Sequence, residues 1–252
     1  MRRSSHLRTQ YWKAAVLFLL LLGYGAAARA QQVTLSARVE LLPPSGQPKP
    51  TDASGVVVWL DPLARPAPLD DPPAAPPWRS GRLVQKHKAF IPHIIVVQAG
   101  SSVDFPNDDP FFHNVFSLFE GKRFDLGLYE AGSSRAVKFD RPGICYIFCN
   151  IHPQMSAVIV VVQTPHWAIS DRSGTVTIPD VPPGRYMLHV WHERSLPETL
   201  NGLTREVSVT ESSHSLGTLR VREAPGLNLA HKNKYGRDYD APTPPNSVYQ
   251  QP

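Results

Sequence analysis

Cysteine is scarce in this sequence: its 252 residues include only Cys145 and Cys149. The two lie four positions apart on one predicted strand, so their side chains share a face while their Cα atoms are about 13 Å apart at about 3.3 Å per residue. A disulfide needs Cα atoms within about 7 Å of each other. The spacing therefore excludes an intramolecular disulfide, and we interpret Cys145 as a small buried hydrophobe.

Net charge is also lacking once the first thirty residues are set aside. Of the 26 basic residues, five precede residue 31, which leaves 21 basic residues against 21 acidic ones. The sequence contains no basic stripe with interleaved aromatic residues, the pattern that marks a nucleic-acid surface. We therefore expect no nucleic-acid partner.

Long hydrophobic runs are limited to Ala14–Ala28, a stretch of fifteen residues. A membrane-spanning helix needs about 20 apolar residues. The run follows a positively charged start and precedes the small residues of an A-x-A cleavage site, Ala28-Arg-Ala30, which is the order of a secretory signal peptide. The sequence therefore predicts a signal peptide over residues 1–30, a periplasmic location and no membrane attachment after cleavage, with an uncleaved anchor as the alternative.

A helical period is missing as well, and short runs of β-branched and aromatic residues occur instead, separated by turn residues. This pattern predicts an all-β protein with a Greek-key sandwich. Residues 63–80 are expected to be a linker, because seven prolines fall between Asp61 and Pro77 and such a density prevents strand pairing. The predicted strands are Gln32–Leu42, Gly55–Leu60, Arg82–Lys86, Ile94–Gln98, Ser102–Phe105, Asn114–Ser117, Ala136–Phe139, Gly143–Cys149 and Ser156–Val162.

What the sequence does contain is a set of soft metal ligands. Cys149, His152 and Met155 lie within seven residues, between two predicted strands, and His113 lies thirty-six positions upstream of Cys149. Two histidines and a cysteine with a weak axial methionine form the ligand set of an electron-transfer copper site. Zinc could use the cysteine and both histidines, but a thioether is a poor fourth ligand for it. The remaining alternative is a buried cysteine with surface histidines nearby.

The motif Cys149-Asn-Ile-His152-Pro-Gln-Met155 resembles the ligand loop of the type 1 (blue) copper proteins, the cupredoxins of the plastocyanin and amicyanin type. The resemblance covers residues 81–163 and includes Val97–Asn107 and His113-Asn-Val. It implies one type 1 copper, with His113, Cys149 and His152 as equatorial ligands and Met155 as the axial one. It also implies that Asn114 braces the ligand loops and that redox partner proteins dock near His152.

One residue departs from the amicyanin pattern. Ile151 takes the place of a proline immediately before the second histidine, so it keeps a backbone N–H that can bond the Cys149 sulfur. Hydrogen bonding around that sulfur tunes the reduction potential. The segment Leu118–Tyr129 has no clear strand pattern and is a candidate to cover the metal region.

Residues 164–222 resemble a carboxypeptidase-regulatory or transthyretin-like β module, in the D-x-x-G turn at Asp171–Gly174 and in Val181-Pro-Pro-Gly-Arg-Tyr186. They offer about four strands, few for a self-sufficient sandwich. We therefore predict that residues 31–62 pair with 164–222 and that the copper domain is inserted between them; two consecutive sandwiches are the alternative. Residues 223–252 are polar and proline-rich and are expected to form a disordered tail.

These features predict an exported copper protein that carries single electrons and is not an enzyme, because a full ligand set leaves no open coordination position for catalysis. A periplasmic copper-binding or copper-delivery protein is the alternative. Surplus methionine and histidine clusters would favour delivery, but the chain has three methionines and no tract rich in either residue.

Overall fold

The computed structural model describes residues 32–64, 81–118, 122–225 and 232–239. Within those ranges the regular structure consists of seventeen strands and one short helix, α2 (Pro197–Asn201), so the predicted all-β class is confirmed. No helix in this described part has the length and apolar character needed to cross a membrane. The expected signal peptide (1–30) and most of the proline-rich linker (65–80) lie outside the described residues.

The N-terminal and C-terminal segments share two sheets, one ordered β14-β1-β17 and the other β13-β2-β15-β16. In the first, β1 is antiparallel to β14 and parallel to β17; in the second, β2 is antiparallel to both β13 and β15. Each sheet therefore has an interior strand from the N-terminal segment. The strands of these two sheets are β1 (Val33–Leu42), β2 (Val57–Pro62), β13 (Trp167–Ile169), β14 (Thr175–Val181), β15 (Gly184–Trp191), β16 (Arg205–Val209) and β17 (Ser215–Arg222).

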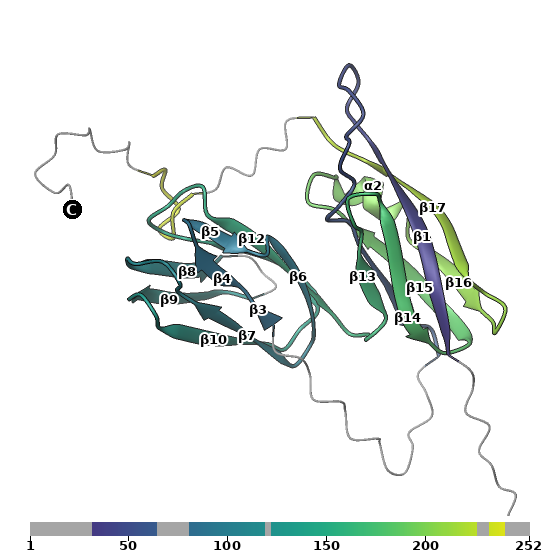
Figure 1. The fold of residues 1–252 in the computed structure, drawn as a ribbon, viewed down its shortest axis with the longest axis horizontal. Coiled ribbons are helices and arrows are strands. Elements are labelled where there is room, and N and C mark those ends of the chain that lie inside the picture. Colours follow the sequence, from purple (N-terminus) through teal and green to yellow (C-terminus); the bar gives the residue numbers. More distant parts are fainter. Residues whose placement is uncertain (1–31, 65–80, 119–121, 226–231, 240–252) are drawn as a thin grey trace, which may run out of the picture. The chain divides into compact units, whose positions relative to one another are not determined.

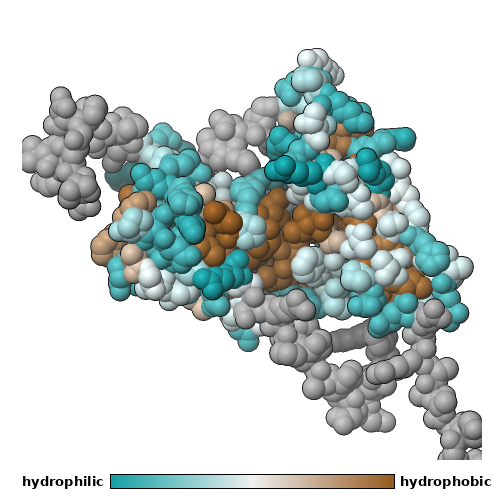
Figure 2. Space-filling model, viewed as in Figure 1, coloured by the Kyte–Doolittle hydropathy of each residue, from teal (hydrophilic) through white to brown (hydrophobic). Residues whose placement is uncertain are grey.

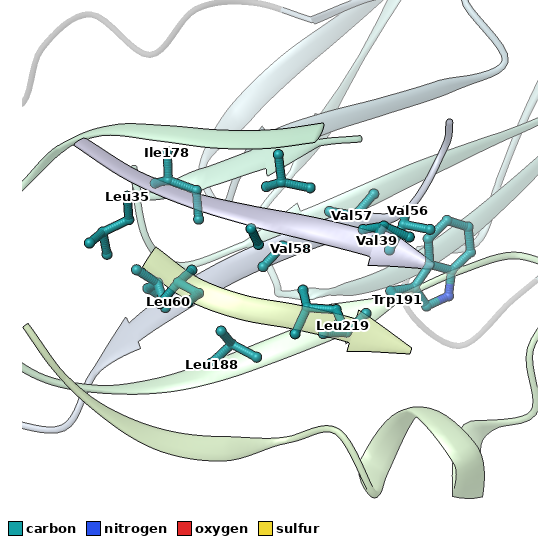
Figure 3. Close-up of a cluster of buried hydrophobic side chains, with 14 of the residues drawn as sticks. Leu35, Val39, Val56, Val57, Val58, Leu60, Ile178, Leu188, Trp191 and Leu219 are labelled. Atoms are coloured by element: carbon teal, nitrogen blue, oxygen red, sulfur yellow. The ribbon is translucent and has the colours of Figure 1, made fainter. Parts of the chain in front are cut away.

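The core between these two sheets follows from the alternation of β1. Its odd-numbered residues from Val33 to Leu41 are buried, and its even-numbered residues up to Arg38 are exposed, as the two-residue period of a strand requires. Figure 3 shows Leu35 and Val39 of β1 in one cluster with Leu60 of β2 and Leu219 of β17. On the surface shown in Figure 2, hydrophobic residues gather in a few patches between broader hydrophilic areas.

The intervening residues build a second pair of sheets, a five-stranded one ordered β6-β12-β11-β8-β9 and a three-stranded one ordered β10-β7-β3, with a separate β4-β5 hairpin (Figure 1). Their own core cluster includes Phe105, Phe139, Ile147 and Ile159. The strands are β3 (Gly81–Arg82), β4 (Val84–Lys86), β5 (Ala89–Ile91), β6 (Ile94–Gln98), β7 (Ser101–Pro106), β8 (His113–Ser117), β9 (Phe124–Tyr129), β10 (Ser134–Phe139), β11 (Gly143–Phe148) and β12 (Ser156–Val162).

Strand β12 is buried on both faces. Ile159 and Val161 belong to the core cluster of the intervening residues, whereas Val158, Val160 and Val162 belong to the cluster of the N- and C-terminal sheets. A strand with two covered faces has no polar side to present, so its sequence is an unbroken apolar run.

Strand β9 lies in the segment for which the sequence showed no strand pattern. It is the edge strand beside β8, with an irregular register and Gly127 at φ +66°. Phe124 and Leu126 pack against the core cluster while Leu128 is exposed. The glycine and the irregular register break the alternation, so that Leu128 is exposed and Tyr129 is buried, which is why the strand could not be recognised from the sequence.

His192 follows β15 directly and is buried, with its Nδ1 3.2 Å from the Ser195 hydroxyl. Burial, assisted by the charge of Arg194 and opposed by Glu193, lowers the pKa of His192 from 6.5 to about 4. Between these values the unfolded chain binds the proton that the folded chain excludes, so the free energy of unfolding decreases as the pH falls.

We expect acidification from pH 6.5 to pH 4 to destabilise the wild-type chain by roughly 2–3 kcal/mol more than it destabilises His192→Gln. Urea unfolding at several pH values measures this difference. The same substitution at the exposed His214 provides the control for the exchange of histidine for glutamine. Parallel pH profiles for wild type and His192→Gln would contradict the assignment.

Candidate metal centre

The predicted ligands lie at the ends of three neighbouring strands. His113 is the first residue of β8, Cys149 directly follows β11, and Met155 directly precedes β12. β11 and β12 are antiparallel and paired in register up to Phe148 and Ser156, so the seven residues 149–155 form the loop between them. β8 pairs with β11 through Phe116 and Phe148. This topology brings the two separate ligand motifs to the same end of one sheet.

Three donor side chains converge there. The Cys149 Sγ lies 3.8 Å from His113 Nδ1 and 3.7 Å from His152 Nδ1, and the two Nδ1 atoms are 3.2 Å apart. Donors held about 2.0–2.3 Å from one ion lie roughly 3–4 Å from one another, so these separations fit a shared metal ion. Among the described residues this is the one group of three or more histidine, cysteine or acidic side chains positioned in that way.

Met155 is fully buried and belongs to the same apolar cluster as Cys149. The loop closes through two backbone hydrogen bonds, from the Cys149 N–H to the Met155 carbonyl (3.2 Å) and from the Met155 N–H to the His152 carbonyl (3.0 Å). These bonds hold the backbone of Met155 beside those of Cys149 and His152 in the same short loop. Its role as the axial ligand stays a prediction.

The surroundings of Cys149 favour its thiolate form. Burial alone would raise the pKa of this thiol, but hydrogen bonds from His113 and from the backbone N–H groups of Asn114, Ile151 and His152 outweigh it and lower the pKa. The thiolate is the form that binds metals. The N–H of Ile151, which the sequence singled out, is one of these donors.

Cys145 contrasts with its neighbour. It is buried, is free of any disulfide, and has its pKa raised to about 11, mainly by burial. The thiol is therefore protonated and packs as a hydrophobic side chain, in line with its interpretation from the sequence.

A buried carboxylate orients His113. The Nε2 atom of His113 lies 2.8 Å from Asp109 Oδ2 and donates its proton to that carboxylate, while Nδ1 faces the Cys149 sulfur and His152 Nδ1. Asp109 also accepts the backbone N–H groups of His87 (2.6 Å) and Lys88 (2.9 Å). These two residues form the turn between β4 and β5, both with positive φ. Such a carboxylate fixes the tautomer and ring orientation of a metal-binding histidine.

Asp109 is not among the site residues that the sequence motifs predict. The residue lies four positions before His113 in a loop, and metal-binding histidines usually donate their second N–H to a carboxylate or carbonyl. The nearness of an acidic residue to a candidate ligand could therefore have indicated a carboxylate partner for His113. The same argument would have applied equally well to Asp108.

Replacing Asp109 by asparagine should lower the affinity of this centre for a metal ion by about 10–100-fold, because outer-shell partners of ligating histidines have effects of this size. Competition with a chelator of known affinity measures it. Asp108→Asn removes the same charge from an exposed neighbour and should change the affinity less than twofold. Equal losses for the two variants would show that charge alone, and not the bond to His113, is responsible.

Asn114 does not act as the resemblance implied. Its side-chain amide donates to Asp125 of β9 (2.6 Å), not to the ligand loop. Its contact with the site is made by its backbone N–H, which bonds the Cys149 sulfur. The residue therefore holds β9 against β8 while its main chain supports the thiolate.

The more accessible side of the centre carries aromatic and aliphatic side chains. His152 is partly buried, and the Phe111 ring lies 5.8 Å from its ring and 5.2 Å from that of His113. The ammonium of the exposed Lys88 lies 5.4 Å from the centre of the Phe111 ring. Phe112 and Ile151, which directly precede His113 and His152, are 55% and 45% exposed.

No protein-family profile and no curated protein matches this sequence. Solved structures with similarity to part of it include a purple cupredoxin from Nitrosopumilus maritimus, with 20% identity over 32% of this chain and 99% of that one and a TM-score of 0.30. A copper-containing nitrite reductase from Thermus scotoductus SA-01 has 22% identity over 41% of this chain and 26% of its own, with a TM-score of 0.32. A reduced mutant of amicyanin has 18% identity over 32% of this chain and 81% of its own, with a TM-score of 0.31.

Proposed function

We propose that residues 81–163 bind one type 1 copper ion and that this exported protein carries single electrons between redox partner proteins. The observation that carries the proposal is the convergence of one thiolate-prone cysteine and two imidazole nitrogens within 4.8 Å of one another at the end of a sheet. Cysteine sulfur with imidazole nitrogen suits copper. Copper bound there would supply a one-electron couple, Cu(II)/Cu(I).

The chain's own residues supply rigidity, which a one-electron carrier needs so that its ligands move little between oxidation states. His113 is held by the Asp109 carboxylate, and Cys149 by three backbone N–H groups. The 149–155 loop is closed by its own hydrogen bonds between two paired strands. Each ligand is thus positioned by contacts that do not depend on a metal.

A docking site for redox partners is part of this proposal. His152 is the least buried of the three converging ligands, and the exposed Ile151 precedes it directly in the chain. Phe111 packs against its ring, and the Lys88 ammonium lies 5.4 Å from the centre of the Phe111 ring, so a partner would meet an apolar surface with one positive charge beside it. We place the route for electrons at His152 for this reason.

Addition of Cu(II) to the purified copper-free protein tests the proposal. We expect saturation at one copper per chain, an intense thiolate-to-copper absorption in the red, and a reversible one-electron wave in voltammetry. A colourless complex, or a coloured one without a reversible wave, would contradict the carrier function. The second of these results would favour copper binding or delivery.

The axial role of Met155 has its own test. Met155→Leu should retain copper and colour while raising the reduction potential by at least about 59 mV, a tenfold change in the one-electron equilibrium, because a weak donor to the oxidised ion is lost. Voltammetry measures the shift. Complete loss of copper from this variant would identify Met155 as a principal ligand instead.

A further inference from the structure

A short segment near the C-terminus, Lys232–Tyr239, forms a compact turn of its own. The Asn233 side-chain oxygen accepts the backbone N–H groups of Tyr235 (3.0 Å) and Arg237 (3.1 Å), and the Asn233 N–H bonds the Arg237 carbonyl (2.8 Å). Gly236 has the left-handed φ of +75° that this turn requires. One asparagine thus organises the segment into a defined shape.

This turn contacts the ligand loop directly (Figure 1, yellow). The Tyr239 hydroxyl donates to the carbonyl oxygen of Cys149 (2.8 Å), and the Lys234 backbone N–H donates to Asn150 Oδ1 (2.9 Å). Both acceptors lie beyond the end of β11, where the β11–β12 ladder no longer supplies partners. The turn therefore supplies donors to the stretch of loop that begins with the cysteine ligand.

The same turn also reaches the other ligand-bearing strand. Lys234 Nζ lies 2.8 Å from Asp125 Oδ2, and Asp125 in turn accepts the side-chain amide of Asn114, the residue after His113. The ion pair is partly exposed, so by itself it contributes little. The position of the ion pair matters more. It links β9, and through Asn114 also β8, to the turn that is hydrogen-bonded to Cys149 and Asn150.

We propose that Lys232–Tyr239 is a clamp that positions the two ligand-bearing elements relative to each other, with Tyr239 and Lys234 as its positioning residues. The clamp slows opening of the 149–155 loop whether or not a metal is bound. Its effect on copper retention rests on the proposed function, whereas its effect on the loop of the copper-free chain does not.

The first test is amide hydrogen exchange in the copper-free full chain. Tyr239→Phe removes one hydroxyl and should raise exchange at the Cys149 and Met155 amides about fivefold, the value of one ordinary hydrogen bond. The control within the same segment is Arg237→Gln, which changes an exposed side chain and should leave both amides unchanged. Adding Lys234→Met to Tyr239→Phe should raise exchange further.

Amides of β1 serve as an internal reference, because the clamp does not touch that strand. A rise confined to the ligand loop supports the clamp. Unchanged exchange in the double variant, or an equal rise at the loop and in β1, would overturn it.

The second test is copper release to an excess of chelator. Tyr239→Phe should accelerate release about fivefold without abolishing the red absorption, and Arg237→Gln should not accelerate it. Faster loop exchange in a chain that fails to bind copper would support the clamp and reject the copper function. Normal copper binding with unaltered exchange and release would reject the clamp alone.

Discussion

Replacement of Cys149 by serine will abolish the red absorption of the copper-loaded protein, whereas replacement of Cys145 by alanine will leave it almost unchanged. The band is a charge transfer from thiolate sulfur to copper, and a serine hydroxyl cannot supply it. Both cysteines belong to the same core cluster, but only Cys149 faces the two imidazoles, at 3.7–3.8 Å. Visible spectroscopy after addition of one equivalent of Cu(II) measures the outcome.

The Cys145→Ala variant is a demanding control because it also removes a buried side chain from the same sheet. It should lose some stability, on the order of 1 kcal/mol for a small cavity, which thermal unfolding will reveal. Loss of colour in Cys145→Ala together with retained colour in Cys149→Ser would show that the ligand assignment is wrong.

The second large effect concerns the domain organisation. A fragment of residues 164–252 is expected not to fold, whereas residues 31–62 joined to 164–222 by a short flexible linker should form a cooperative β-fold without copper. Without β1, strands β14 and β17 lose their shared neighbour, and without β2 the same happens to β13 and β15. Circular dichroism with thermal melting distinguishes a cooperative fold from an unfolded chain.

The size of the expected stability loss follows from the side chains that β1 and β2 bury. Seven valine and leucine side chains of β1 and β2 are buried: Val33, Leu35, Val39, Leu41, Val57, Val58 and Leu60. Each contributes about 1.5–3 kcal/mol when fully buried, so their loss amounts to about 10–21 kcal/mol, which is comparable to or larger than the 5–15 kcal/mol that typically stabilises a domain. A stable, cooperatively melting fragment 164–222 would contradict the inserted arrangement.

The complementary fragment, residues 81–163, should fold and bind copper, since it includes the candidate ligands and both of its sheets. One face of β12 would be uncovered in this fragment, because Val158, Val160 and Val162 belong to the core cluster of the N- and C-terminal sheets. We expect this fragment to aggregate more readily than the full chain, and Val160→Thr to reduce that tendency.

Strands with one buried face and a clear alternation, such as β1, and strands buried on both faces, such as β12, could be predicted from the sequence almost to the residue. Edge strand β9 could not, because Gly127 interrupts it and only some of its side chains are covered. Local pattern is informative where burial is uniform along a strand and fails where partners far along the chain decide it.

The converging histidines and cysteine follow from motif spacing, whereas the groups that hold them do not. Asp109 and Tyr239 act through single hydrogen bonds whose existence depends on the tertiary fold. Tyr239 lies ninety residues from the loop it contacts, in a stretch whose composition suggested no structure at all. A polar composition predicts that a segment has no apolar core of its own. It does not predict the individual hydrogen bonds that the segment makes in the folded chain.

The interior position of β1 and β2 has a consequence for the order of folding. Roughly 100 residues separate β2 from β13, its antiparallel neighbour. The ends of the intervening domain lie close together, because Gly81 abuts Val97, and Val97 pairs with Val161. If that domain folds first, the loop to be closed shrinks about fivefold, which lowers its closure entropy by about 1.4 kcal/mol. Residues 81–163 would then serve as a folding nucleus for the two sheets that β1 and β2 share with the C-terminal segment, and variants that slow their folding should also delay the appearance of the β1–β17 pairing.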